Sequence, residues 1–561
     1  MRLRYKFRDN KKLFSTQMDH SKIGIDGGFI VGETLLSEYD QTPYYSFKGI
    51  PYAHPPVGPL RFKPPKCLER LEGTIECFKD KDACAQRGLM MFPQVFLGSE
   101  DCLYLNVYSP KENSSNTLRP VMVFIHGGGF SGGSSDSHIY TPDLLVSKGV
   151  VLVTLNYRLN VFGFLNLGLE ECPGNVGLLD QRLALTWVKK HISKFMGDPE
   201  NITLFGESAG SASVHYQMIS PLSKGLFHKV ILQSGSSLDP WAYMDPSDSI
   251  DRAFRVGKLL GCETSNVKEL HKFLLNAPLE ELREKTYSSL GAEDYAKGVV
   301  FPFVPSREIV GTEKFLPEDP DKLLAKTLHV PILCGLNSAE GLLLYVENPK
   351  LLPKVLKDVR KVFDTCFPAD LKHLTSDGAK LEAARNKVKE FYLKAGATSD
   401  SDIVNAYADF SGDINFGRGN RKLLDSILTT QPSQPVYLYQ FAFESRLSLA
   451  RLFGNQPDYL KGACHVDELP LMFFSVLARS IILELDSHKH VAETLAALWT
   501  NFAKFGNPNG DVMSDWKPIS TDEVSHCVID EELRIQQGFI YNERIEFWND
   551  LYHSLLSHCK L

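Results

Sequence analysis

The sequence predicts an α/β fold in which a large, mainly parallel sheet is flanked by helices. Continuous apolar runs recur along the chain, as expected of strands buried on both faces of such a sheet. They cover residues 121–125, 150–157, 202–205, 230–233, 329–335 and 436–443. Apolar residues at helical spacing follow at 178–195 and 491–505, the second ending at Gly506-Asn507-Pro508. Alternating strands and helices are typical of α/β proteins, and the part up to about Tyr108 looks β-rich and antiparallel.

No linker or repeat divides the 561 residues. We therefore expect a flexible basic tail over residues 1–22 and one domain over residues 23–561. The charged stretch around residues 350–387 is interpreted as amphipathic surface helices rather than as a linker.

Charge and cysteine content exclude several classes of protein. A net charge of −7 and a pI near 6.2 provide no basic field for nucleic acid. Eleven cysteines, an odd number, argue against a fully disulfide-bonded secreted protein. No signal-peptide core follows the basic N-terminus, and no 18-residue apolar stretch predicts a transmembrane helix. We therefore expect a cytoplasmic protein.

Both ends of the chain leave alternatives for its location. Basic and apolar residues alternate over residues 2–8 and could make weak contact with an anionic membrane surface, although a frayed, solvated tail is the favoured interpretation. The last three residues, Cys559-Lys560-Leu561, are a relaxed form of the S-K-L peroxisomal signal.

The motif that indicates chemistry is Gly206-Glu207-Ser208-Ala209-Gly210, directly after the apolar run 202–205. A G-x-S-x-G that joins a strand to a helix is the nucleophile-elbow pattern. The flanking glycines leave room for a crowded backbone, and the serine hydroxyl is exposed at a helix N-terminus that favours developing negative charge. Ser208 is therefore the candidate nucleophile.

A second motif, His126-Gly127-Gly128-Gly129-Phe130, follows the strand predicted at 121–125. It matches the loop whose backbone N–H groups form an oxyanion hole. Glycines suit that task because no side chain blocks the approach of the substrate oxygen. A G-x-S-x-G alone can arise by chance, but together the two motifs predict acyl-transfer chemistry.

A serine nucleophile needs a base and an orienting acid, in the chain order Ser, Asp/Glu, His. Glu340 is the candidate acid, because residues 331–341 read as a strand that runs into a glycine-bounded loop. His465 is a candidate base in a later loop, but spacing alone does not single it out among 16 histidines.

Long segments of the chain resemble the type-B carboxylesterase (carboxylesterase/cholinesterase) family, with details most similar to the insect alpha-esterases. The resemblance covers nearly the whole chain and is strongest at residues 47–53, 99–106, 126–130, 156–158, 174–181, 197–208, 337–341 and 462–469. It implies an α/β-hydrolase fold, and a triad in which Ser208 is the nucleophile, His465 the base and then acid, and Glu340 its orienting partner. It also implies an oxyanion hole at Gly128, Gly129 and Ala209, with Glu207 and Ser234 beside the triad and Trp241 lining the acyl pocket.

The chain departs from the family pattern at several positions. Cys84 and Cys102 match the first family disulfide, but Cys262 lacks the cysteine that would close the second. The loop 85–101 contains no tryptophan, whereas cholinesterases bind choline with one there, so acetylcholine is disfavoured as substrate. Glu207 replaces the glutamine common in juvenile hormone esterases, which disfavours that activity.

These observations predict a hydrolase of small carboxylic esters that uses a covalent acyl-enzyme in detoxification or diet. The same serine is expected to bind organophosphates and carbamates covalently, and the chemistry requires no cofactor or metal. The alternatives are a neutral lipase or a hormone esterase at membranes or droplets, and a non-catalytic, cholinesterase-like interaction protein. The last is disfavoured because all three triad residues are present. The oligomeric state is not predicted.

Overall fold

The computed structural model describes residues 20–88, 95–111, 117–296, 299–348, 350–365, 367–368, 371–375, 377–394, 399–453 and 460–556. Most of the predicted basic tail and all of Cys559-Lys560-Leu561 lie outside these ranges. The described chain begins with the first strand, β1 (His20–Ile25). The division into a tail and one domain stays a prediction.

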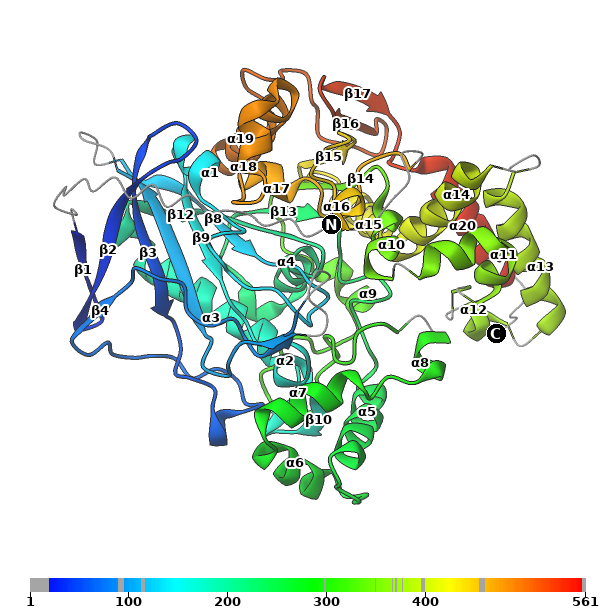
Figure 1. Ribbon diagram of the computed structural model, residues 1–561, viewed down its shortest axis with the longest axis horizontal. Coiled ribbons are helices and arrows are strands. Elements are labelled where there is room, and N and C mark those ends of the chain that lie inside the picture. The colour runs from blue at the N-terminus through cyan, green and yellow to red at the C-terminus, as the bar shows by residue number, and fades with distance from the viewer. Residues whose placement is uncertain are drawn as a thin grey trace, which may run out of the picture.

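A sheet of 13 strands forms the centre of the described chain (Figure 1). The seven central strands β9, β8, β12, β13, β14, β15 and β16 run parallel to one another, whereas β1, β2, β3 and β7 pair antiparallel in sequence, as predicted for the N-terminal part. In spatial order after β1 the strands are β2 (Gly28–Leu36), β3 (Pro43–Pro51), β7 (Tyr104–Pro110), β9 (Val151–Leu155), β8 (Arg119–Ile125), β12 (Gly197–Glu207), β13 (Lys229–Gln233), β14 (Ile332–Asn337), β15 (Val436–Phe441), β16 (Ser525–Ile529) and β17 (Arg534–Gln537), with β4 (Thr74–Glu76) paired to β2. All six strands predicted from apolar runs are present.

The central strands are buried on both faces because helices cover each side. Along β8, Val121 and Val123 join the apolar cluster that contains α3 (Val176–His191) and α4 (Ala209–Ile219). Met122 and Phe124 point the other way, into the cluster with α1 (Asp143–Ser147) and α19 (Asp486–Phe505). Two apolar faces on one strand explain why the runs show no polar alternation.

A third apolar cluster lies among helices that gather at one end of the molecule (right in Figure 1). They are α11 (Leu351–Thr365), α13 (Gly378–Tyr392), α14 (Asp400–Gly412) and α20 (Asn542–Leu556), with α15 (Arg418–Thr430) running back toward the sheet. The stretch 350–387 is helical over much of its length, as predicted, and buries Val355 and Phe363 in this cluster.

Shorter elements complete the described fold. The helices are α2 (Asn160–Phe164), α5 (Pro246–Leu259), α6 (Val267–Asn276), α7 (Leu279–Tyr287), α8 (Ala292–Ala296), α9 (Pro320–Leu323), α10 (Leu343–Glu347), α12 (Leu371–Leu374), α16 (Leu449–Phe453), α17 (Leu469–Met472) and α18 (Arg479–Glu484). Two small hairpins pair β5 (Gln86–Arg87) with β6 (Phe96–Leu97) and β10 (Asn166–Leu169) with β11 (Cys172–Pro173).

The disulfide predicted between Cys84 and Cys102 is present, with an S–S distance of 2.05 Å, whereas Cys262 is a free thiol. Within the described part of the chain, no helix combines the length and apolarity needed to cross a bilayer.

Candidate active site

Ser208 occupies the sharp turn between β12 and α4, with φ 57° and ψ −123°. A positive φ strains a residue with a Cβ, and such strain concentrates at functional sites. Its neighbours Glu207 and Ala209 are buried, but Ser208 is partly exposed. The glycines are required sterically, because a Cβ at Gly206 would lie 2.5 Å from the carbonyl carbon of Gly210, and one at Gly210 only 2.0 Å from the oxygen of Ile125. The predicted nucleophile elbow is therefore present.

The glycine loop after β8 lies directly beside this turn. A Cβ at Gly127 would be 3.1 Å from the Cβ of Ser208, and Gly128 and Gly129 adopt φ values of 107° and 60°. The amide of Ala209, first residue of α4, has no acceptor within its own helix. The structure thus brings together the three residues predicted to form an oxyanion hole.

Burial lowers the pKa of His126, at the start of this loop, to about 4. The imidazole is therefore neutral near pH 7. Its Nδ1 lies 2.9 Å from the carbonyl oxygen of Gly127, and its ring stacks on Tyr157 with centroids 4.5 Å apart. His126 thus holds the backbone of the loop.

Glu340 and His465 come from distant parts of the chain and form a buried pair. The Nδ1 of His465 lies 2.7 Å from one Glu340 oxygen, and each residue is 1% exposed. The other Glu340 oxygen accepts hydrogen bonds from the Ser234 hydroxyl at 2.5 Å and from the backbone N–H of Asn337 at 2.7 Å. Glu340 is therefore held at both oxygens, and Ser234 lies where the resemblance implied.

On its other side, His465 faces Glu207. The Nε2 atom of His465 lies 3.0 Å from Glu207 Oε1. Burial alone would lower the pKa of His465, but the charges of Glu207 and Glu340 outweigh it and raise the pKa to about 9. Burial raises the pKa of Glu207 to about 8, against the opposite effect of His465. The pair therefore retains a proton to higher pH than either group would in water.

A further buried carboxylate, Glu468, was missed by the sequence analysis. One of its oxygens accepts from Gln233 Nε2 at 3.0 Å and the other from Asn337 Nδ2 at 2.8 Å. Asn337 Nδ2 also donates to the carbonyl of Cys464, next to His465. Glu468 thereby joins β13 and β14 to the histidine loop. The acidic pair Asp467-Glu468, followed directly by the apolar residues 469–472, was the signal that could have identified it.

Aromatic side chains enclose the site. The Phe416 ring lies 4.4 Å from that of His465, and the Trp241 ring lies 6.0 Å from Phe416, 6.3 Å from Phe130 and 6.4 Å from Phe301. The Trp241 Nε1 donates to a backbone carbonyl. Trp241, expected in the acyl pocket, thus packs near Phe416, which in turn contacts His465. Phe416 was not predicted from the sequence.

The Phe301 ring lies against the glycine loop. A Cβ at Gly129 would fall 2.1 Å from the Cζ of Phe301. Phe301 and Trp241 therefore limit the space beside the oxyanion-hole residues.

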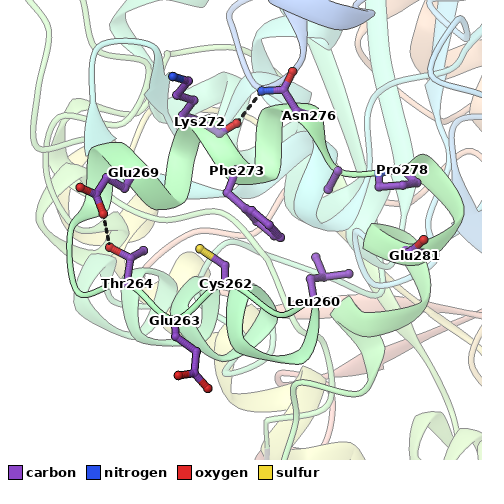
Figure 2. Close-up of a pocket in the computed structure, with 11 residues that line it drawn as sticks. Leu260, Cys262, Glu263, Thr264, Glu269, Lys272, Phe273, Asn276, Pro278 and Glu281 are labelled. Atoms are coloured by element: carbon purple, nitrogen blue, oxygen red, sulfur yellow. Dashed lines mark hydrogen bonds between the residues drawn. The ribbon is translucent and has the colours of Figure 1, made fainter.

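A separate groove of about 550 Å³ lies between α5, α6 and α7 (Figure 2). Its wall is largely apolar, and the Cys262 thiol faces the Phe273 ring across it. It shares no lining residue with the surroundings of His465.

Among the described residues, Asp80, Asp136 and His138 could bring three ligand atoms within 4.8 Å of one another. Asp80 already accepts hydrogen bonds from Asn106 and Ser137, and His138 is exposed. The cluster shares no residue with the predicted triad.

Comparison with known proteins identifies relatives along almost the whole chain. A model of the carboxylesterase family matches residues 19–548. The chain is 33% identical to the juvenile hormone esterase of Tribolium castaneum, over 88% of this chain and 85% of that protein, and 32% identical to esterase FE4 of Myzus persicae, over 89% and 87%. The crystal structure of juvenile hormone esterase from Manduca sexta, with OTFP covalently attached, matches with a TM-score of 0.81 and 28% identity, covering 95% of this chain and all of that one. These matches confirm the predicted α/β-hydrolase fold.

Proposed function

Because this chain belongs to the carboxylesterase family and is a hydrolase of carboxylic esters, we propose that Ser208, His465 and Glu340 are its catalytic triad. The observation that carries the proposal is the strained, partly exposed Ser208 on its elbow, in a site that also holds the buried Glu340–His465 pair. Labelling with a fluorophosphonate, followed by peptide mapping, tests it. Modification of Ser208, lost in Ser208→Ala, is the expected result, and stable modification elsewhere would contradict it.

The proposed reaction has two steps. Ser208 Oγ attacks the ester carbonyl carbon while His465 Nε2 takes the hydroxyl proton. The resulting oxyanion is stabilised by the amides of Gly128, Gly129 and Ala209, each contributing about 3 kcal/mol to transition-state stabilisation. His465 then protonates the leaving alcohol, and the C–O bond breaks to give the acyl-enzyme.

Water completes the cycle. His465 removes a proton from water, which attacks the acyl carbon, and returns the proton to Ser208 as the carboxylic acid leaves. Glu340 orients the imidazole through Nδ1 and stabilises its positive charge. When ionised, Glu207, 3.0 Å from Nε2, adds a second negative charge that stabilises the imidazolium.

For substrates, we propose small apolar esters with short acyl chains, met in detoxification or diet. The supporting observation is the limited space between Gly129 and Phe301, with Trp241 beyond it. A hormone esterase is the second candidate, because two of the relatives described above are juvenile hormone esterases. Comparing kcat/KM for short-chain p-nitrophenyl esters and for juvenile hormone distinguishes the two.

We also propose that Ser208 traps organophosphates and carbamates. Attack at phosphorus expels the leaving group and forms a phosphoryl-serine. Its hydrolysis would need water in line with the Ser208 Oγ–P bond, a geometry that a site built for planar esters does not provide. The protein should therefore bind such toxins one to one. Repeated rapid turnover of an organophosphate would contradict this.

A cytoplasmic location remains our proposal, with the peroxisome and the membrane surface as alternatives. Imaging of the full-length chain beside a variant lacking Cys559-Lys560-Leu561 distinguishes them.

A further inference from the structure

Between α14 and α15 the helical chain changes its winding. Asp413–Gly417 forms a five-residue π-helix, a rare conformation that occurs frequently at functional sites. This short segment provides two contacts to the candidate site. The Phe416 ring lies 4.4 Å from the His465 ring, and the Asn415 carbonyl accepts a hydrogen bond from Trp241 Nε1 at 2.8 Å.

One arginine on α20 spans the start of this π-helix. The Arg544 guanidinium contacts Asp409, on the last turn of α14, at 2.6 Å and Asp413, the first π-helical residue, at 2.9 Å. Asp413 is fully buried, and its second oxygen accepts from the Tyr392 hydroxyl at 2.6 Å. Tyr392 in turn accepts from Trp548 Nε1 at 2.7 Å. Polar contacts therefore connect the start of the π-helix to α13 and α20.

The same arginine is connected to the acid of the proposed triad through Tyr541 and Asn337. Its guanidinium lies 4.1 Å from the ring centroid of Tyr541, whose hydroxyl donates to the Asn337 carbonyl. The backbone N–H of Asn337 donates a hydrogen bond to Glu340. Arg544 thus contacts residues that support both Phe416 and Glu340.

We propose that Arg544 is a positioning residue of the active site: by joining Asp409 and Asp413 across the start of the π-helix, it holds Phe416 against His465. The planar guanidinium can contact two carboxylates at once, which the point charge of lysine does less well. This inference rests on the proposed function, because it acts through His465.

The test compares Arg544→Lys with a matched control. Arg421 also contacts two carboxylates, Asp425 on α15 at 2.8 Å and Glu546 on α20 at 2.7 Å, and stacks on Phe539, and none of these partners lies on the π-helix. With active sites titrated by a fluorophosphonate, Arg544→Lys should lower kcat/KM for p-nitrophenyl butyrate about tenfold, because small misplacements near reacting groups are costly. Arg421→Lys should remain within about twofold. Equal effects of the two substitutions would overturn the proposal.

A double-mutant cycle with Phe416→Leu separates positioning from general stabilisation. If Arg544 acts through Phe416, Arg544→Lys should change kcat/KM by less than about twofold in the Phe416→Leu background. Additive effects, or a lower Tm with unchanged activity per titrated site, would contradict the proposal.

If Arg544→Lys does not fold, Asp409→Asn provides the test. The Asp409 side chain is 40% exposed, and removing its charge leaves the contact between Arg544 and Asp413 in place. We expect Asp409→Asn to lower kcat/KM per titrated site about threefold, which is less than the loss expected for Arg544→Lys. An unchanged kcat/KM would overturn the proposal. Failure of the wild-type protein to label at Ser208 would instead refute the proposed function.

Discussion

Replacement of Glu207 by glutamine should move the pH dependence of catalysis. Burial alone would lower the pKa of His465, and the charges of Glu207 and Glu340 raise it to about 9. At the 3.0 Å between Glu207 Oε1 and His465 Nε2, one unit charge contributes about 5 kcal/mol at an effective dielectric constant of about 20. That energy corresponds to about four pKa units. The shift in Glu207→Gln should be smaller, because the amide dipole of glutamine still stabilises the imidazolium in part and the surrounding groups rearrange. We therefore expect Glu207→Gln to lower the apparent pKa by at least about one unit.

The assay is the pH profile of kcat/KM for p-nitrophenyl butyrate. His465 must be neutral to act as a base, so activity rises with pH through its pKa, and the rise should occur at lower pH in Glu207→Gln. Glu468→Gln is the matched control, a buried glutamate whose oxygens are bonded to Gln233 and Asn337 rather than to His465. It should produce a smaller shift. Coincident wild-type and Glu207→Gln profiles would refute the electrostatic role of Glu207.

Further predictions concern the triad, the pocket and stability. Ser208→Ala and His465→Ala should each lower kcat about 10⁴-fold or more, because the two residues act as a unit. Glu340→Gln should lower kcat by a smaller factor. Steady-state kinetics will measure all three. Phe301→Ala should raise kcat/KM for p-nitrophenyl octanoate relative to the butyrate about tenfold by opening space beside Gly129, and an unchanged ratio would exclude Phe301 from acyl selection. His465 and Glu207 both have pKa values raised by folding, to about 9 and about 8, so the folded state binds more protons and Tm should fall as pH rises from about 6.5 to 9. The fall should be smaller in Glu207→Gln.

The sequence predicted those parts of the site that are local in the chain. The elbow at Ser208 and the loop at 126–130 each depend on a few consecutive residues whose steric needs select glycine, and both are present. Apolar runs identified the central strands because burial on both faces removes polar alternation. Glu340 and His465 are 125 residues apart, and only the family resemblance, not spacing, indicated that they would meet.

Other features depend on contacts for which the sequence holds no periodic signal. Phe416 contacts His465 from a five-residue π-helix between two ordinary helices, and no propensity pattern predicts that winding. Arg544 is one of four charged residues on α20, and nothing in the sequence pairs it with α14. Its role depends on Asp409 and Asp413 being close in space, which requires the packed arrangement of α14 and α20.

A covalent acyl-enzyme at Ser208 can be tested by a stopped-flow measurement of p-nitrophenol release from p-nitrophenyl butyrate by the purified protein. We expect a burst near one equivalent, abolished by prior treatment with a fluorophosphonate that modifies Ser208. No burst together with no labelling of Ser208 would contradict a covalent acyl-enzyme at this site.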